Sequence, residues 1–420
     1  MNWIYSQSGG TTGVAEILIS LSLMLMLGFA MTRLTKLLRL PNVTAYIVTG
    51  ILMGPYVLNL IPASFIANTD FLTDIALAFI AFSVGEHLDF AKLKKRGKKS
   101  AVIALFEALM ASLLVFILMF VVLRLDFVFS IVLAVLASLT APASTMMTIR
   151  QTGARGDYVD TLLQVIAMDN VVGLVAFSIV IAAISPFVKG IAGGGAFSSV
   201  IQPLLINLLL IALGIGFAWL LKALTPTRRT ADNRLIIAVG ILLFFAGVSA
   251  YFDVLPLLGC MTMGLVFANI EGHEKLFRQL NYFSPPILVL FFVRSGLSFD
   301  LSTLTAKGTV GSTSLVLIAV LYFVVRLIGK YSGSYLGALV TGKSKEVRNY
   351  LGLALAPQAG VAIGLAALCV RQLGQDVGGT LQTIILASSV LYELIGPASA
   401  KLGLYLSGSY ELEKKDVPTL

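Results

Sequence analysis

Apolar stretches long enough to cross a membrane recur along this chain, and they limit the folds that it can adopt. A hydrocarbon core of ~30 Å is crossed by about 20 mostly apolar residues in a helix. Of the 420 residues, 58% are hydrophobic and 12% are charged, whereas soluble domains carry about 25% charged residues. These properties exclude a soluble enzyme, a nucleic-acid-binding protein and a secreted disulfide scaffold. They predict an all-α integral membrane protein.

Charged and Pro/Gly-rich breaks divide the apolar sequence into about thirteen predicted membrane helices. The predicted spans are residues 12–32, 42–62, 71–88, 99–123, 127–149, 158–186, 201–222, 234–252, 254–270, 282–298, 308–341, 349–371 and 377–407. Little polar sequence remains outside them, so we expect one transmembrane domain over residues 1–420 and no soluble regulatory domain. Cys260 and Cys369 lie inside apolar runs and are expected to pack in the core.

The distribution of basic residues predicts the orientation of the chain, because cytoplasmic loops of membrane proteins attract Lys and Arg. Most of them follow odd-numbered spans, including the cluster at residues 92–99, while the even-numbered connections contain Arg124, Lys189, Lys307 and Arg371. We therefore expect a multi-pass protein of the inner (plasma) membrane with its N-terminus outside and its C-terminus in the cytoplasm. The net charge of +9 then reflects topology and attraction to anionic lipid headgroups, not nucleic-acid binding.

Two predicted spans contain a proline near their middle. The fifth span contains SLTAPAS, with Pro142, and the twelfth contains LAPQAG, with Pro357, Gln358 and Gly360. Proline removes a backbone donor and clashes with the preceding turn, so each helix is expected to break and to expose backbone groups at membrane depth. The two spans run in opposite directions. Such paired interruptions indicate an inverted-repeat transporter with its site near the midplane of the bilayer.

Ionisable side chains within the spans are costly in lipid and therefore indicate functional positions. Asp169 lies about twelve residues into the sixth span, ~18 Å deep at ~1.5 Å per residue. Arg326 and Lys330 lie one helical turn apart on the eleventh span, and Glu107 and Glu393 are acids of the fourth and thirteenth spans. We expect Lys330 to neighbour the ion site and Arg326 to pair with Glu107, either as charge compensation during transport or as a structural buried ion pair.

Asp169 and the break in the fifth span offer suitable ligands for a monovalent cation. Carboxylate and freed carbonyl oxygens are the hard ligands that suit a small alkali cation, and a buried carboxyl group can exchange a proton near neutral pH. The candidate ligands are Asp169, the Asn170 side chain, Thr140 or Ser138, backbone oxygens and water. Competition between a cation and a proton for one carboxylate is sufficient for antiport.

The sequence gives no support to catalysis or to a bound cofactor. It contains no nucleophile–base constellation and no phosphate loop. His87 and His273 are the two histidines, and they lie in different loops, so we expect no metal site of the histidine type.

These residues resemble the monovalent cation:proton antiporter superfamily, which has the sodium/proton exchanger fold, and within it the bacterial NapA-like and Kef-like branch. The resemblance covers nearly the whole chain. It is carried, in order, by the segments LTKLLRLPNVTAYIVTGILMGP, DNVVGLVAF, ALAPQAGVAIGLA and LYELIGP. The resemblance implies an NhaA-like inverted-repeat fold in which spans five and twelve are crossing discontinuous helices. It also implies a homodimer, and exchange of Na⁺ or Li⁺, with K⁺ a further candidate, for H⁺.

The resemblance further implies a mobile core domain that moves past a scaffold domain in an elevator-type mechanism. We place the core at approximately residues 71–186 and 282–407, and the scaffold and dimerisation helices at approximately 12–62 and 201–270. Kef-type relatives normally carry a nucleotide-binding domain after the last helix. This chain has only about a dozen polar residues there, so we expect no nucleotide gating within it.

The chain departs from the family pattern at two positions. Relatives carry Asp-Asp, Asn-Asp or Gln-Asp in the ion-binding helix, whereas this chain has Asp169-Asn170 at these two positions. The second departure is Ala141, which occupies a position where some exchangers have an acidic residue. Three explanations are open. Asp169 is the working carboxylate, the register slips by one so that Met168-Asp169 matches Gln-Asp, or Asn170 is an engineered neutralisation. The amide of Asn170 can bind a cation through its oxygen but cannot exchange a proton.

A transporter of another class remains as the alternative. A sodium-coupled symporter of a small organic anion can be built on a related fold, and it predicts a roomier polar cavity beside the broken helices. Few uncharged polar side chains flank the acids of this chain, which favours a bare ion as the substrate.

Overall fold

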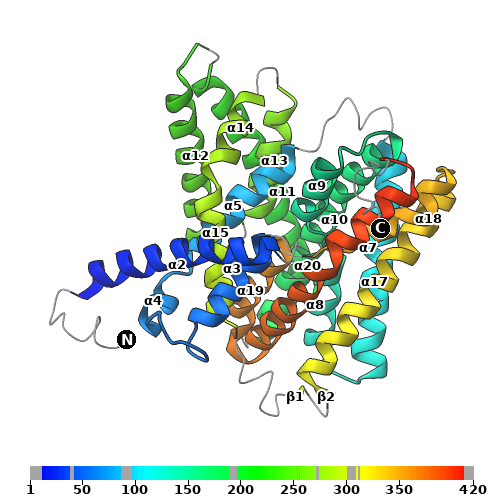
Figure 1. Ribbon diagram of the computed structural model, residues 1–420, viewed down its shortest axis with the longest axis horizontal. Coiled ribbons are helices and arrows are strands. Elements are labelled where there is room, and N and C mark those ends of the chain that lie inside the picture. The colour runs from blue at the N-terminus through cyan, green and yellow to red at the C-terminus, as the bar shows by residue number, and fades with distance from the viewer. Residues whose placement is uncertain are drawn as a thin grey trace, which may run out of the picture.

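The computed structural model describes residues 12–410 with gaps at 38–41, 87–96, 189–195, 227, 253, 255, 271–273, 300–308, 311–312 and 359. The described part is almost wholly helical (Figure 1). A two-stranded antiparallel pair, β1 (Thr309–Val310) and β2 (Thr313–Ser314), precedes one of the long helices.

The helices are described in chain order by their bounds. They are α2 (Thr12–Leu37), α3 (Asn42–Met53), α4 (Ala63–Asn68), α5 (Phe71–Glu86), α7 (Lys98–Phe116), η2 (Ile117–Val122), α8 (Phe127–Ser138), α9 (Pro142–Thr152), α10 (Asp157–Val188), α11 (Ala196–Leu224), α12 (Ala231–Tyr251), α13 (Leu257–Ala268), α14 (Glu274–Phe283), α15 (Pro285–Leu297), α17 (Leu315–Val340), α18 (Lys345–Ala354), α19 (Gly360–Gly374), η3 (Gln375–Gly379) and α20 (Thr380–Leu406).

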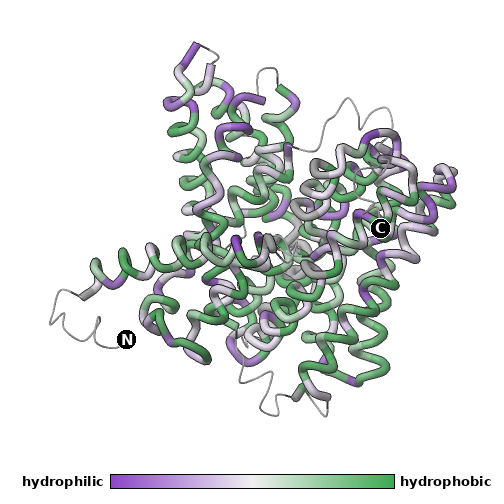
Figure 2. Tube along the Cα trace, in the orientation of Figure 1, coloured by the Kyte–Doolittle hydropathy of each residue, from purple (hydrophilic) through white to green (hydrophobic). Residues whose placement is uncertain are grey.

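Six helices of the described part are long and apolar enough to cross a membrane, and two bent helix pairs raise this number to eight if each is one span. The prediction of about thirteen spans therefore stays a prediction. Several predicted spans contain shorter apolar helices, each of which is too short by itself to cross the hydrocarbon core. Examples are Asn42–Met53, Phe127–Ser138 and Leu257–Ala268. Hydrophobic residues predominate along most of the helical trace (Figure 2), as expected where lipid and not water surrounds the helices.

Both proline-containing spans are interrupted in the structure. Helix α8 ends at Ser138, and α9 begins with Pro142 in its first turn, where the missing N–H of proline costs no hydrogen bond. Helix α18 ends at Ala354, and α19 begins at Gly360. The Ala141 N–H donates to the Pro357 carbonyl over 2.9 Å, so the two interruptions lie against each other.

Small residues on one face of α17 allow it to pack closely along α7, and Figure 1 shows the two helices side by side. A Cβ atom added to Gly333 would lie 2.6 Å from the Glu107 Cα atom, and one added to Gly329 would lie 2.6 Å from the Ala111 Cα atom. No side chain fits between backbones at this spacing. The close approach brings the buried charges of the two helices together.

The packing also bears on the expected division into core and scaffold. The residue ranges predicted for the core include α5 and α15. In the structure α5 packs chiefly against α13, and α15 against α3. Glycines allow close backbone contact in both pairs of helices. An added Cβ on Gly85 of α5 would lie 2.3 Å from the carbonyl oxygen of Met261 in α13, and an added Cβ on Gly50 of α3 would lie 2.0 Å from the carbonyl oxygen of Val293 in α15. The main neighbours of α5 and α15 thus belong to the helices predicted as scaffold.

Candidate cation site at the two helix breaks

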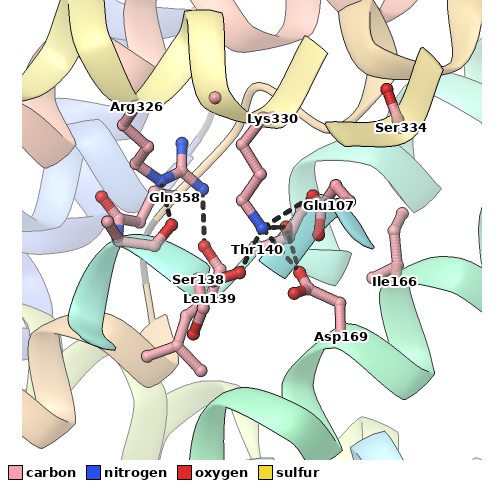
Figure 3. Close-up of polar contacts among 12 residues, drawn as sticks. Glu107, Ser138, Leu139, Thr140, Ile166, Asp169, Arg326, Lys330, Ser334 and Gln358 are labelled. Atoms are coloured by element: carbon pink, nitrogen blue, oxygen red, sulfur yellow. Dashed lines mark hydrogen bonds and ion pairs between the residues drawn. The ribbon is translucent and has the colours of Figure 1, made fainter. Parts of the chain in front are cut away.

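The ammonium group of Lys330 lies among four oxygen atoms (Figure 3). It donates to Thr140 Oγ1 over 2.9 Å, to Asp169 Oδ2 over 3.0 Å and to the Ser138 carbonyl, and it lies 2.7 Å from Glu107 Oε1. The side chains of Lys330, Asp169 and Glu107 are all fully buried. An ammonium has three protons, so the four oxygens compete for them. The structure therefore brings five residues that the sequence singled out to one point.

Arg326 does not pair with Glu107, so the predicted pairing of these two residues is wrong. The guanidinium instead donates to three backbone carbonyls, those of Ala137 at 2.9 Å, Leu139 at 2.5 Å and Ala356 at 2.8 Å. Carbonyls at a helix C-terminus lack partners within the helix. The planar guanidinium carries five donors and can reach several of them, and its positive charge suits the negative end of the helix dipole.

A polar network beside Arg326 ties the second break to α8. The Gln358 side chain donates to the Leu136 carbonyl over 2.7 Å and accepts from the Tyr322 hydroxyl over 3.2 Å. The guanidinium of Arg326 lies 4.5 Å from the ring centroid of Tyr392, in a cation–π contact. The sequence reasoning missed both tyrosines. For Tyr322 a signal existed, because it precedes Arg326 by four residues and therefore shares its helix face.

Asp169 and Asn170 each present a buried oxygen without a hydrogen bond to the part of the chain that the structure describes. Asp169 Oδ2 accepts from Lys330 and from the Thr140 hydroxyl, but Asp169 Oδ1 has no partner. The Asn170 amide donates to the Ile166 carbonyl over 2.9 Å and leaves its own Oδ1 unpaired. Both residues are fully buried. Unsatisfied buried oxygens are uncommon, and oxygens of this kind suit an alkali cation.

The other residues that the sequence singled out do not contribute a side chain to this arrangement in the described structure. The Ser138 hydroxyl donates to the Val135 carbonyl over 2.7 Å, so it is the backbone oxygen of Ser138 that faces Lys330. Glu393 belongs to α20, but its side chain lies outside the described residues, as do His87 and His273. Among the described residues, no group of three or more His, Cys, Asp or Glu side chains is arranged to hold a metal ion.

Comparison with protein families identifies the chain. Residues 19–395 match the family model described as "Sodium/hydrogen exchanger, transmembrane". The chain belongs to the sodium/hydrogen exchanger family. The resemblance to the sodium/proton exchanger family is thereby confirmed. Because relatives in this family are named as cation/proton antiporters, the protein is a multi-pass membrane transporter and not an enzyme.

Individual relatives are distant in sequence but similar in fold. The chain is 23% identical over 336 residues to the probable Na(+)/H(+) antiporter GerT of Bacillus cereus, covering 78% of this chain and 84% of that one. A 42% identical match to cation/H(+) antiporter 19 of Arabidopsis thaliana spans 78 residues, which is 17% of this chain but only 10% of that protein.

The structure of the sodium proton antiporter MjNhaP1 from Methanocaldococcus jannaschii superimposes with a TM-score of 0.75 at 16% identity. The match covers 94% of this chain and 99% of that chain. The shared fold and the family match support cation/proton antiport, and they do not favour the symporter alternative.

Proposed function

We propose that this protein is a secondary antiporter that exchanges a monovalent cation, Na⁺ or Li⁺ with K⁺ a further candidate, for protons across a plasma membrane. Cation and proton compete for the carboxylate of Asp169. One observation carries the proposal. Asp169 is fully buried beside a helix break, one of its oxygens is shared by Lys330 and Thr140, and the other is unpaired among the described residues.

The charges around Asp169 explain why a cation and a proton exclude each other. With Asp169 and Glu107 ionised and Lys330 protonated, two negative charges face one positive charge. Burying an uncompensated charge in a low-dielectric interior is costly. A proton on Asp169 removes the excess negative charge, and a bound monovalent cation offsets it equally well. The site is neutral with either one and positively charged with both.

Oxygens of the required chemistry lie at the proposed site. Asp169 Oδ1 and Asn170 Oδ1 are buried and unpaired in the described structure. The first break supplies the Ser138 carbonyl and the Thr140 hydroxyl, both of which contact Lys330. Asn170 contributes an uncharged ligand. Asp169 is then the working carboxylate, and the Asp-Asn pair forms a single-carboxylate site.

The packing supports an assignment of the moving parts of the transporter. We place α7–α10 and α17–α20 in the mobile core and the remaining helices, α5 and α15 included, in the scaffold, because α7 and α17 are packed backbone to backbone while α5 and α15 pack on scaffold helices. The core moves past the scaffold in an elevator-type cycle. The protein acts as a homodimer in lipid, with its N-terminus outside and its C-terminus in the cytoplasm.

Transport in proteoliposomes tests the proposal. A pH-sensitive dye reports proton movement after addition of Na⁺, Li⁺ or K⁺ to vesicles with the unaltered chain, Asp169→Asn or Asn170→Asp. Asp232→Asn, an exposed change of the same kind on α12, is the control. We expect exchange by the unaltered and control proteins and none by Asp169→Asn. Exchange by Asp169→Asn at the unaltered rate refutes the proposal, and exchange that requires Asn170→Asp moves the working carboxylate to position 170.

A further inference from the structure

We infer that Glu107 is a second counter-ion for Lys330, which receives the ammonium group when a cation displaces it from Asp169. This inference rests on the proposed function, and it assigns a specific task to Glu107, which lies on a different helix from the ion-binding residues. In this role Glu107 is a positioning residue that acts on cation binding through Lys330.

The distances place the ammonium between two carboxylates. Lys330 Nζ lies 3.0 Å from Asp169 Oδ2 and 2.7 Å from Glu107 Oε1. A small rotation of the lysine side chain is enough to strengthen one contact and weaken the other. In the described structure these are the two acids that pair with Lys330.

The hydrogen bonds of Lys330 are distributed unevenly between the two acids. Its donor contacts go to Asp169, Thr140 and the Ser138 carbonyl, which together match the three protons of an ammonium. Neither carboxylate oxygen of Glu107 receives a hydrogen bond from the described residues, although one of them lies in ion-pair contact. Glu107 thus has unused capacity to accept the protons that Lys330 withdraws from Asp169.

The position of Glu107 is fixed by backbone packing. The Gly333 backbone lies directly against Glu107, where an added Cβ would come within 2.6 Å of the Glu107 Cα. Gly333 is on the same helix as Lys330, three residues further along. The backbone at Glu107 therefore stays against the helix that carries the lysine whatever happens at Asp169, which keeps the acid within reach of the ammonium.

The second acid changes how strongly the lysine opposes the cation. A cation at Asp169 repels the neighbouring ammonium, which has to move away. Without Glu107, the displaced ammonium would be buried and unpaired, and that penalty would weaken cation binding. With Glu107, the ammonium keeps a full ion pair. Glu107 therefore raises the affinity of Asp169 for the cation.

Cation affinity at one fixed pH tests the inference. The half-saturating Na⁺ or Li⁺ concentration is measured twice, from the exchange rate in proteoliposomes and from thermal stabilisation of the detergent-solubilised protein by the salt. We expect Glu107→Gln to raise it about tenfold or more, which corresponds to ~1.4 kcal/mol, with the maximal rate changed much less. Glu107→Asp, which keeps the carboxylate, should restore most of the affinity. Glu16→Gln is the matched control. Glu16 lies on α2, is partly exposed, and accepts a hydrogen bond from the Ser64 hydroxyl.

A second background shows whether Glu107 acts through Lys330. In Lys330→Gln, no ammonium remains to be received and only the direct attraction of Glu107 for the cation can be lost, so adding Glu107→Gln should raise the half-saturating concentration much less than it does with the lysine present. An equal rise in both backgrounds, or no rise in either, overturns the inference. If Glu107→Gln alone does not fold, the comparison of Lys330→Gln with the double variant still tests the inference, because a rise of tenfold or more there would arise without the lysine and would overturn it.

The outcomes separate this inference from the proposed function. If the unaltered protein exchanges cations for protons and Glu107→Gln binds the cation equally well, the inference fails and the antiport proposal stands. If the unaltered protein exchanges no cation for protons, the antiport proposal itself fails.

Discussion

Replacing Arg326 by methionine should destabilise the protein and slow transport, because the guanidinium joins the two helix breaks. It donates to Ala137 and Leu139 at the first break and to Ala356 at the second. Methionine has a comparable apolar length but no donors. The substitution therefore leaves three buried carbonyls without their charged partner.

The expected loss can be worked from these three contacts. A hydrogen bond to a charged group contributes about 1.5–3 kcal/mol, so three contribute about 4.5–9 kcal/mol before the cost of burying the guanidinium is subtracted. That cost is several kcal/mol for a buried ion. The net expectation is about 3–5 kcal/mol. For a chain of this length, an unfolding entropy of about 2.1 cal/mol/K per residue converts this loss to a fall in melting temperature of roughly 3–6 °C.

Thermal unfolding of the detergent-solubilised protein, followed by intrinsic fluorescence, measures the fall in melting temperature. Proteoliposome exchange measures the accompanying loss of rate. Arg371→Met is the matched control, since Arg371 is about one-third exposed and pairs with Asp74 over 2.8 Å, and exposed ion pairs contribute only about 0–1 kcal/mol. If Arg326→Met melts within 1 °C of the control and transports at the unaltered rate, the guanidinium does not hold the breaks together and the reasoning is wrong.

Two further changes test the packing and the ligands of the site. Gly333→Ala places a Cβ 2.6 Å from the Glu107 Cα, and we expect this overpacking to lower the free energy of unfolding by about 1–3 kcal/mol. The control is Gly216→Ala, whose Cβ meets nothing within 4 Å and which should melt at or above the temperature of the unaltered protein. Equal melting temperatures of the two variants would contradict the close packing. Thr140→Val removes the hydroxyl that contacts Asp169 and Lys330 while keeping the side-chain shape. We expect a severalfold rise in the half-saturating cation concentration with little change in melting temperature. Unchanged cation affinity would exclude the hydroxyl from the site.

The membrane character and the places where the helices break were predictable because they depend on local chemistry. Hydrophobicity over a window of about 20 residues reflects transfer into lipid. Pro142 and Pro357 act on their own segments, since a proline ring clashes with the preceding helical turn and its nitrogen has no hydrogen to donate. Asp169, Lys330 and Glu107 could likewise be recognised as functional candidates. A charged side chain within an apolar helix is costly in lipid, and this cost can be read from the sequence around that residue.

The partners of the buried charges were not predictable in the same way. Arg326 and Lys330 are one turn apart and share a helix face, so either could have met Glu107. The choice depends on the rotation and depth at which α17 packs against α7, which Gly329 and Gly333 fix by close backbone contact. That packing places Lys330 beside Glu107 and leaves Arg326 facing the broken helix ends.

The sequence by itself determined that this chain is an all-helical membrane transporter, with two interrupted helices and a small set of buried charges. It also carried the segments that resemble the family to which the chain belongs. Only the tertiary structure decided that Lys330 is shared by two acids, that Arg326 binds carbonyls of both breaks, and that α5 packs chiefly against α13 and α15 against α3. The physical reason is that composition and helix breaks are set within one segment, whereas ion pairing depends on which backbones can approach each other across segments far apart in the chain.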